Sequence, residues 1–165
     1  MHINFLILLV AALIPILVGF VWYNPKTFGK AWAKSAGIAE GAKMNNMAVV
    51  FGLTFLFSFF LAFIMQMLTI HQFHVGGLLM TQPDSADPNS EAAQMLKKFM
   101  ELFGNSYRTF KHGAFHGTLA GIMLALPILG INALFEGKGF KYIAINAGFW
   151  IVCMALMGGI ICGFA

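Results

Sequence analysis

Four long apolar stretches constrain what this chain can fold into more than any other feature of its sequence. The first, residues 3–23, holds no charged side chain and is long enough to cross the hydrocarbon core of a bilayer, which is roughly 30 Å thick. Comparable stretches cover residues 47–70, 110–134 and 141–164. Only 10% of the residues are charged, against about a quarter in soluble domains. The sequence therefore predicts one all-α integral membrane domain over residues 1–165, a bundle of four transmembrane helices.

Two further segments have the pattern of short amphipathic helices that lie on a membrane surface. In residues 27–37, Trp32 and its apolar neighbours share one helical face, and lysines occupy another. In residues 88–103, apolar side chains recur at the i, i+3, i+4 and i+7 spacing of a helix. Asp87 and Pro88 have the residue types of an N-cap and a first helical residue. We expect the stretch between the second span and Asp87 to form a loop.

The second span carries two stripes of side chains at helical spacing. One stripe is small or polar, and we expect it to face the protein, because hydroxyl and amide groups in lipid seek partners on neighbouring helices. The other is aromatic, and we expect it to face lipid. The first stripe is Thr54, Ser58, Ala62 and Gln66, and the second is Phe51, Phe55, Phe59 and Phe63.

Basic residues predict which side of the membrane each loop faces. The loops after the first and third spans hold six lysines, whereas the longer loop after the second span holds four basic residues among four acids. The excess of basic residues favours the loops after the first and third spans on the cytoplasmic side. We therefore expect a multi-pass protein of the cytoplasmic membrane with both termini outside. The six lysines are Lys26, Lys30, Lys34, Lys43, Lys138 and Lys141.

Aromatic residues lie on the same side as these lysines. They predict anchors in the headgroup region, where amphipathic rings are enriched. The lysines are too sparse for a nucleic-acid surface, so the partner we expect for this side is the lipid bilayer. The predicted anchors are Trp22, Tyr23, Trp32 and Tyr142.

A stripe of glycines marks the start of the third span. In the segment HGAFHGTLAG, which covers residues 112–121, a glycine recurs every four residues, so one side of the helix is bare. The fourth span has a similar small-residue stripe, and the tight turn between the two spans brings both to the same depth. We expect these stripes to pack against each other, and the alternative is a dimer interface. They are Gly113, Gly117 and Gly121, and Ala155, Gly159 and Gly163.

Four spans place all five histidines on one side of the membrane. His71 and His74 end the second span, His112 and His116 begin the third, and His2 precedes the first. Pairs spaced i, i+3 and i, i+4 on neighbouring helices can converge on a metal ion or a haem iron, since imidazole suits zinc, copper, iron and nickel. The alternative is a set of helix-end histidines that bond to headgroups or carbonyls.

If a metal is bound, the imidazole rings need hydrogen-bond partners that hold them in place. The candidates on the same side of the membrane are Gln72, Asp84 and Asp87.

Other chemistry is sparse. No span contains an acidic residue, which argues against a proton-coupled transporter, and no phosphate-binding loop or nucleophile with a base is present. The leading hypothesis is a non-enzymatic module that forms a homo-oligomer or joins a larger membrane complex. The alternative is a metal- or haem-binding membrane protein, for example a redox protein, that uses His71, His74, His112 and His116.

Three stretches together carry a family resemblance. They are WYNPKTFGKAW from Trp22 to Trp32, HGAFHGTLAG, and INAGFW from Ile145 to Trp150. With these, the chain resembles the small bacterial membrane proteins catalogued as domain of unknown function 1761. The resemblance implies an integral membrane protein and brings no established activity with it.

Overall fold

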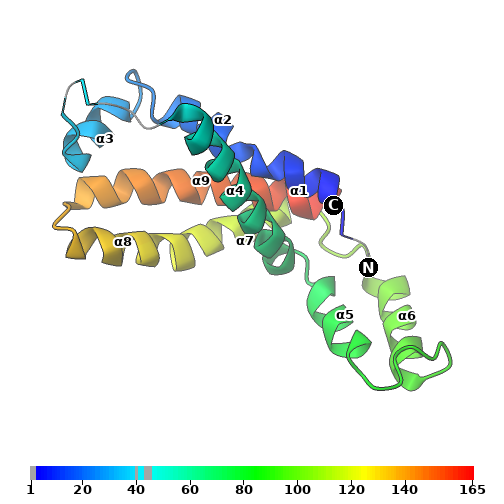
Figure 1. Ribbon diagram of the computed structural model, residues 1–165. Helices are drawn as coiled ribbons and strands as arrows, with labels where there is room; N and C mark the ends of the chain where they lie inside the picture. The colour runs from blue at the N-terminus through cyan, green and yellow to red at the C-terminus, as the bar shows by residue number, and fades with distance from the viewer. Residues whose placement is uncertain (1–2, 40, 43–45) are drawn as a thin grey trace.

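The computed structural model describes residues 3–39, 41–42 and 46–165, and among these the only regular structure is helical (Figure 1). His2 and Lys43 lie outside the described residues. Four helical stretches are long and apolar enough to cross a membrane: Phe5–Trp22, Met47–Thr69, Phe110–Phe135 and Phe140–Phe164. The predicted all-α membrane fold with four spanning helices is confirmed.

The first span is divided by Pro15 into α1 (Phe5–Ala12) and α2 (Ile14–Trp22). Proline has no N–H to donate, and its ring clashes with the carbonyl four residues earlier, here that of Ala11. The helix yields at Leu13, whose N–H bonds to the carbonyl oxygen of Val10 at 3.2 Å, only three residues back. The proline is therefore accommodated by a one-residue interruption of the helix.

The third span also contains a proline, Pro127, and the helix accommodates it in a different way. It consists of α7 (Phe110–Ala120), a π-helical turn η1 (Gly121–Ala125) and α8 (Leu126–Phe135). The π turn widens the helix immediately before Pro127, where a regular turn would press the ring against a carbonyl.

A turn through Gly137, whose φ of +67° suits glycine, then leads into α9 (Phe140–Phe164). The third and fourth spans thus form an antiparallel hairpin (Figure 1).

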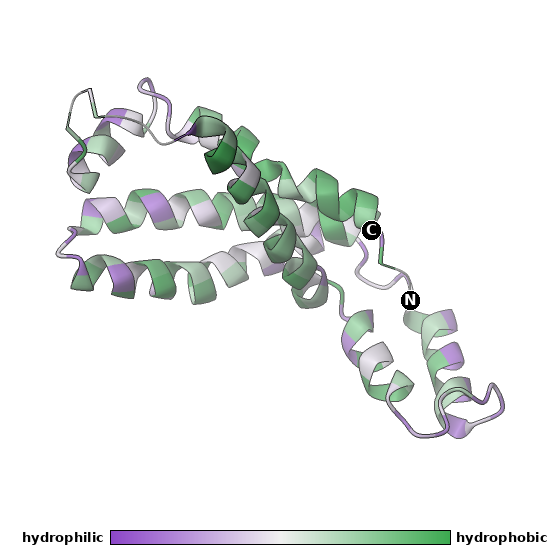
Figure 2. Ribbon diagram, viewed as in Figure 1, coloured by the Kyte–Doolittle hydropathy of each residue, from purple (hydrophilic) through white to green (hydrophobic). Residues whose placement is uncertain are grey.

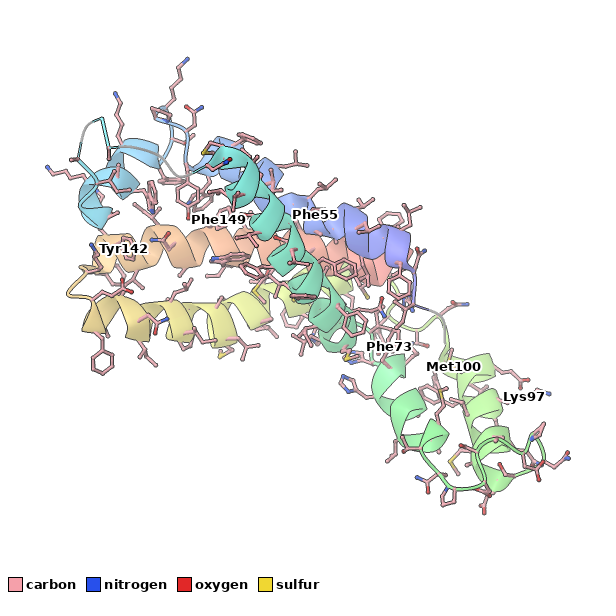
Figure 3. The ribbon with its side chains drawn as sticks, in the orientation of Figure 1. Phe55, Phe73, Lys97, Met100, Tyr142 and Phe149 are labelled. Carbon is pink, nitrogen blue, oxygen red and sulfur yellow. The ribbon has the colours of Figure 1, made fainter. Side chains whose placement is uncertain are left out.

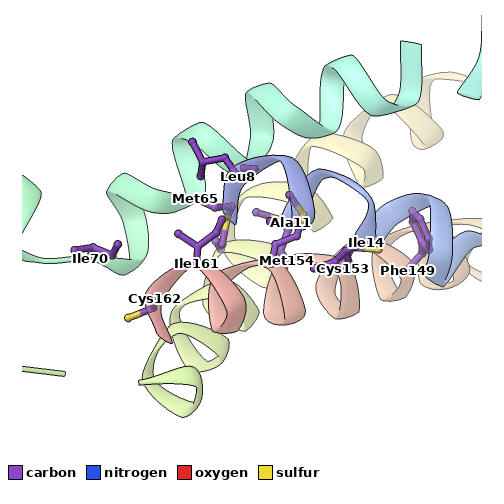
Figure 4. Close-up of a cluster of buried hydrophobic side chains, with 13 residues drawn as sticks. Leu8, Ala11, Ile14, Met65, Ile70, Phe149, Cys153, Met154, Ile161 and Cys162 are labelled. Atoms are coloured by element: carbon purple, nitrogen blue, oxygen red, sulfur yellow. The ribbon is translucent and has the colours of Figure 1, made fainter. Parts of the chain in front are cut away.

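The last helix, α9, is the centre of the bundle. Half of the most apolar 18-residue stretch of this helix is buried inside the protein, against 28% or less of the corresponding stretch in each other span. It contacts α1, α2, α4, α7 and α8, and each of these five helices contacts fewer other helices than α9 does. Buried side chains from three spans meet along it (Figure 4): Leu8, Ala11, Ile14, Met65, Phe149, Cys153, Met154 and Ile161.

The second span, α4 (Met47–Thr69), crosses this core obliquely (Figure 1). Its polar stripe faces inward: Ser58, Ala62 and Gln66 are buried and Thr54 is partly buried. The prediction for the stripe is confirmed.

The prediction for the phenylalanine stripe is wrong at most of its positions. Phe55, Phe59 and Phe63 are only partly exposed, and the last two pack against the core. Phe55, Phe59 and Phe63 each directly follow a residue of the polar stripe in the sequence. They therefore lie at the edge of the buried face of the helix and not opposite it. Phe57 and Phe60 are the more exposed rings of this helix.

The surface helices differ from their predicted bounds. The first, α3, covers Gly29–Ala36 inside the predicted range 27–37. The second, α6, begins at Glu91 and ends at Phe103, with Ser90 as its N-cap, so the predicted start at Pro88 is wrong. The side chain of Ser90 accepts the N–H of Ala93 at 3.2 Å, while Asp87 caps a turn just before the helix.

A further helix, α5 (Gln72–Met80), occupies part of the predicted loop. It pairs with α6 in a hairpin that extends from the bundle, with Phe73 and Met100 between the two helices (Figure 3). Hydrophilic residues gather in the loops and along α6, while the long helices are largely apolar (Figure 2). Gly76 and Gly77 hide this helix from the sequence pattern, because glycine lowers helix propensity.

Candidate metal centre

Three of the four predicted histidines come together where the second span ends and the third begins. His71, His112 and His116 each offer a ring nitrogen, and these nitrogens all lie within 4.8 Å of one another. His71 directly precedes α5, and the other two occupy the first turns of α7. The cluster therefore joins two segments far apart in the sequence.

Local structure places each ring. The backbone at Ile70 is extended, with φ −111° and ψ 99°, so α4 stops and His71 begins a new direction. On the other segment, the Thr109 side chain caps α7 by accepting the N–H of His112 at 3.2 Å. Because the α7 histidines are four residues apart, they lie one above the other on one face.

The rings are in direct contact. The Nε2 atoms of His71 and His112 are 2.9 Å apart, and the ring of His116 lies 4.9 Å from that of His71 and 4.5 Å from that of His112. A tetrahedral ion with bonds of about 2.0–2.1 Å would hold its nitrogens about 3.3 Å apart. Small side-chain rotations would bring the three nitrogens to that separation.

The donor set consists of imidazoles alone. Among the described residues, no cysteine or acidic side chain belongs to the group. His71 is exposed, and His112 and His116 are partly exposed, so an ion could enter from solution. Neutral imidazoles leave the charge of a divalent ion uncompensated, and three ligands leave a coordination position open.

His74, the fourth predicted ligand, is not part of this group. It lies on α5, three residues after His71, and is exposed. Since α5 leads away from α7 (Figure 1), each residue further along it is farther from the α7 histidines. The expected four-histidine site is a three-histidine cluster in the structure.

Tyr107 is a neighbour that the sequence did not indicate. Its ring centre lies 5.1 Å from that of His112, at an interplanar angle of 30°. It also has a φ of +61°, which is uncommon for a residue other than glycine. No sequence pattern reveals that Tyr107 reaches the cluster, because its placement depends on this left-handed backbone.

Gln72, Asp84 and Asp87 were expected to hold the imidazole rings in place. In the structure they have other hydrogen-bond partners or are exposed. The Gln72 side chain donates to the carbonyl oxygens of Phe103 and Ser106 at 2.7 and 2.9 Å, and so ties α5 to the end of α6. Asp87 accepts the N–H of Asn89 at 2.9 Å in the loop before α6. Asp84 is an exposed residue of the same loop.

The striped glycines of the third span, two in α7 and one at the start of η1, lie against α9. A Cβ atom on Gly117 would be 2.7 Å from the carbonyl carbon of Met154 and 2.9 Å from the Cα of Ala155. Gly113 meets Gly158 in the same way, and Gly121 meets Ile151. The backbones of the two helices are therefore in contact along the whole stripe.

The small residues of α9 divide between two neighbours. Ala155 faces the α7 glycines, whereas Gly159 and Gly163 make room for Phe110 at the start of α7. A Cβ on Gly159 would lie 2.6–2.8 Å from the Phe110 ring. The two stripes are thus offset along the helix pair.

The predicted anchors Trp22 and Tyr23 bind α9 directly. The Trp22 indole donates to the carbonyl oxygen of Ile145 at 3.1 Å, and the Tyr23 hydroxyl donates to the side chain of Asn146 at 3.0 Å. Phe149 packs 5.1 Å from the Tyr23 ring (Figure 3). Two of the stretches that carry the resemblance are therefore in contact with each other.

The other two predicted anchors lie at the same end of the molecule. The Trp32 ring packs 5.1 Å from that of Tyr23, which holds α3 against the end of α2. The Lys138 ammonium group lies 5.8 Å from the centre of the Tyr142 ring and donates to the carbonyl oxygen of Ala36 at 2.7 Å.

Comparison with known proteins identifies the family and no close relative. No curated protein and no solved structure matches the chain. A family model described as protein of unknown function (DUF1761) matches residues 6–162, nearly the whole chain. With its spanning helices and the three stretches that meet on α9, this chain belongs to the DUF1761 family.

Proposed function

We propose that this protein binds a divalent transition-metal ion through His71, His112 and His116 at one face of the membrane. The convergence of three imidazoles from two segments far apart in the sequence carries the proposal. Zinc, copper, nickel and iron all accept imidazole ligands, so the donor set suits this group of metals and not magnesium or calcium.

The arrangement supports a bare ion better than haem. A haem iron takes its protein ligands on the two faces of a porphyrin, whereas these three nitrogens converge on one point. Structural zinc sites are usually closed by four protein ligands, while catalytic sites keep a position open for water or substrate. A three-histidine site therefore favours a role in which the ion binds something further.

Metal analysis of histidine variants tests the proposal. The protein is purified in mild detergent, loaded with zinc or cobalt and assayed for metal per chain. We expect His112→Ala and His116→Ala to lose binding, because each leaves only two ligands. His74→Ala is the matched control, a histidine of the same region outside the cluster, and should bind as the unmodified protein does.

Two results would overturn the proposal: no bound metal in the unmodified protein, or equal loss in the His74 variant. Melting curves of each variant separate loss of ligand from loss of fold. His116→Gln, which keeps a polar side chain of similar size, repeats the test where alanine disturbs packing.

Association with itself or with a larger complex stays a prediction. The small-residue stripes that motivated it are occupied within the chain, since Gly117 faces Met154 and Gly159 faces Phe110. An oligomer would have to use another lipid-facing surface. The mass of the purified particle in detergent tests this, and a lone monomer would contradict it.

We also propose that the protein lies in the bacterial cytoplasmic membrane with both termini outside. The loop lysines support this orientation. The histidine cluster lies at the opposite end of the third span from Lys138 and Lys141, and would then face the outside. Labelling of single cysteines introduced at Ser85 and Lys138 in intact cells tests it, and a Lys138 cysteine that reacts first would reverse the orientation.

A further inference from the structure

An apolar groove begins at the histidine cluster and descends along the side of the bundle. The ring of His116 lines its upper part, a cleft of about 220 Å³ whose remaining walls are apolar. These walls are Leu68, Leu119, Ala120, Met123 and Leu124.

A second cleft, of about 410 Å³, continues the first. The two share Leu68 and Leu124, so they form one groove between α4 on one side and α7, η1 and α8 on the other. From His116 to Leu129 the groove follows thirteen residues, which at 1.5 Å each is about 20 Å. One leaflet of the hydrocarbon core is about 15 Å deep.

The groove is open toward the bilayer. Ile64 and Leu124, from its opposite walls, are 50% and 48% exposed. The π-helical turn Gly121–Ala125 forms the middle of one wall, at the point where the two clefts join. π turns within helices are frequent at functional sites.

The metal site and the apolar groove that continues from it together indicate which ligand would bind here. A divalent ion on three neutral imidazoles is a site of net positive charge with an open position, which attracts an anionic oxygen ligand. The groove below it takes one apolar chain. We propose, on the basis of the metal site proposed above, that the protein binds a long-chain carboxylate, with its head group on the metal and its acyl chain in the groove.

The test uses cobalt as the metal and palmitate as the probe, with the protein in nanodiscs of zwitterionic lipid. Palmitate should change the visible cobalt spectrum of the unmodified protein. Ile64→Trp and Leu124→Trp fill the groove without touching the histidines, so both should keep cobalt and need at least about tenfold more palmitate, a loss of roughly 1.4 kcal/mol.

Leu56→Trp is the matched control. Leu56 is 44% exposed on the same helix as Ile64 but does not line either cleft, so its variant should respond to palmitate like the unmodified protein. Acetate, which has a carboxylate and no chain, should act equally on all variants.

The outcomes separate the two proposals. Absence of cobalt from the unmodified protein overturns the metal site and this inference with it. Cobalt binding without a response to palmitate overturns the inference alone. An equal response in the groove-filled variants does so too, because it would show that the carboxylate reaches the metal without the groove.

Discussion

Replacing Gly117 with alanine is the most direct test of how the bundle is held together. The added Cβ atom would lie 2.7 Å from the carbonyl carbon of Met154 and 2.9 Å from the Cα of Ala155. Real Cβ contacts under 3.0 Å are essentially never seen, and both neighbours are backbone atoms of α9. No side-chain rotation can relieve the clash, so the two helices must move apart.

The expected loss of stability follows from the distance by which α7 and α9 must move apart. A gap of 0.5–1 Å forfeits roughly a quarter to a half of each van der Waals contact, and overpacking of a tight interface usually costs about 1–3 kcal/mol. Because α7 and α9 touch along the whole glycine stripe, we expect a loss at the upper end, about 3 kcal/mol. For a chain of this length that corresponds to roughly 6–12 °C in melting temperature.

The assay is thermal unfolding of the purified protein in detergent, with Gly52→Ala as the control. Gly52 lies on the exposed side of α4 with no atom within 4 Å of an added Cβ. Alanine there should be neutral or stabilising by about 0.5–1 kcal/mol, since glycine is the poorer helix former. Equal melting temperatures for the two variants would refute the close packing of α7 on α9.

Three further outcomes are expected. Gly159→Ala should cost less than Gly117→Ala in the same melting assay, because its neighbour is the ring of Phe110, which can move; an equal or larger loss would contradict this. Gly29→Ala should lower the melting temperature, because its Cβ would be 2.8 Å from backbone atoms of Asn24; an unchanged melting temperature would show that this loop is pliable. Zinc affinity should be lower at acidic pH than at neutral pH, because protons compete with the metal for the imidazole nitrogens. Titration of zinc at pH 7.5 and 5.5 measures this, and equal affinities would exclude histidine ligands.

The spans could be predicted from the sequence because length and apolarity are sufficient to identify a membrane helix. The hairpin of α5 and α6 could not, since its first helix contains Gly76 and Gly77 and lacks a clear apolar period. The start of α6 was misplaced because Asp87 and Ser90 are both good N-caps, and only the fold decides between them. The prediction that the phenylalanine stripe faces lipid failed because residues beside a buried stripe are themselves partly buried.

The histidine cluster could be predicted in part. Helix spacing and the order of the spans indicate that His71, His112 and His116 share one end of the bundle. They do not indicate that the chain changes direction after α4 or that α5 carries His74 away from the other three histidines. The proximity of Tyr107 depends on a single left-handed residue, for which the sequence has no marker.

One helix face connects the packing of the bundle with the cluster. On α7, each histidine directly precedes a glycine of the stripe, so the imidazoles lie about 100° round the helix from the surface that touches α9. Contact between Gly117 and α9 therefore sets the rotation of α7, and that rotation directs His112 and His116 toward His71. A side chain larger than glycine in the stripe would turn or displace both histidines together. The segment HGAFHGTLAG is thus one structural unit, in which the glycines that pack the bundle also orient the residues of the proposed metal site.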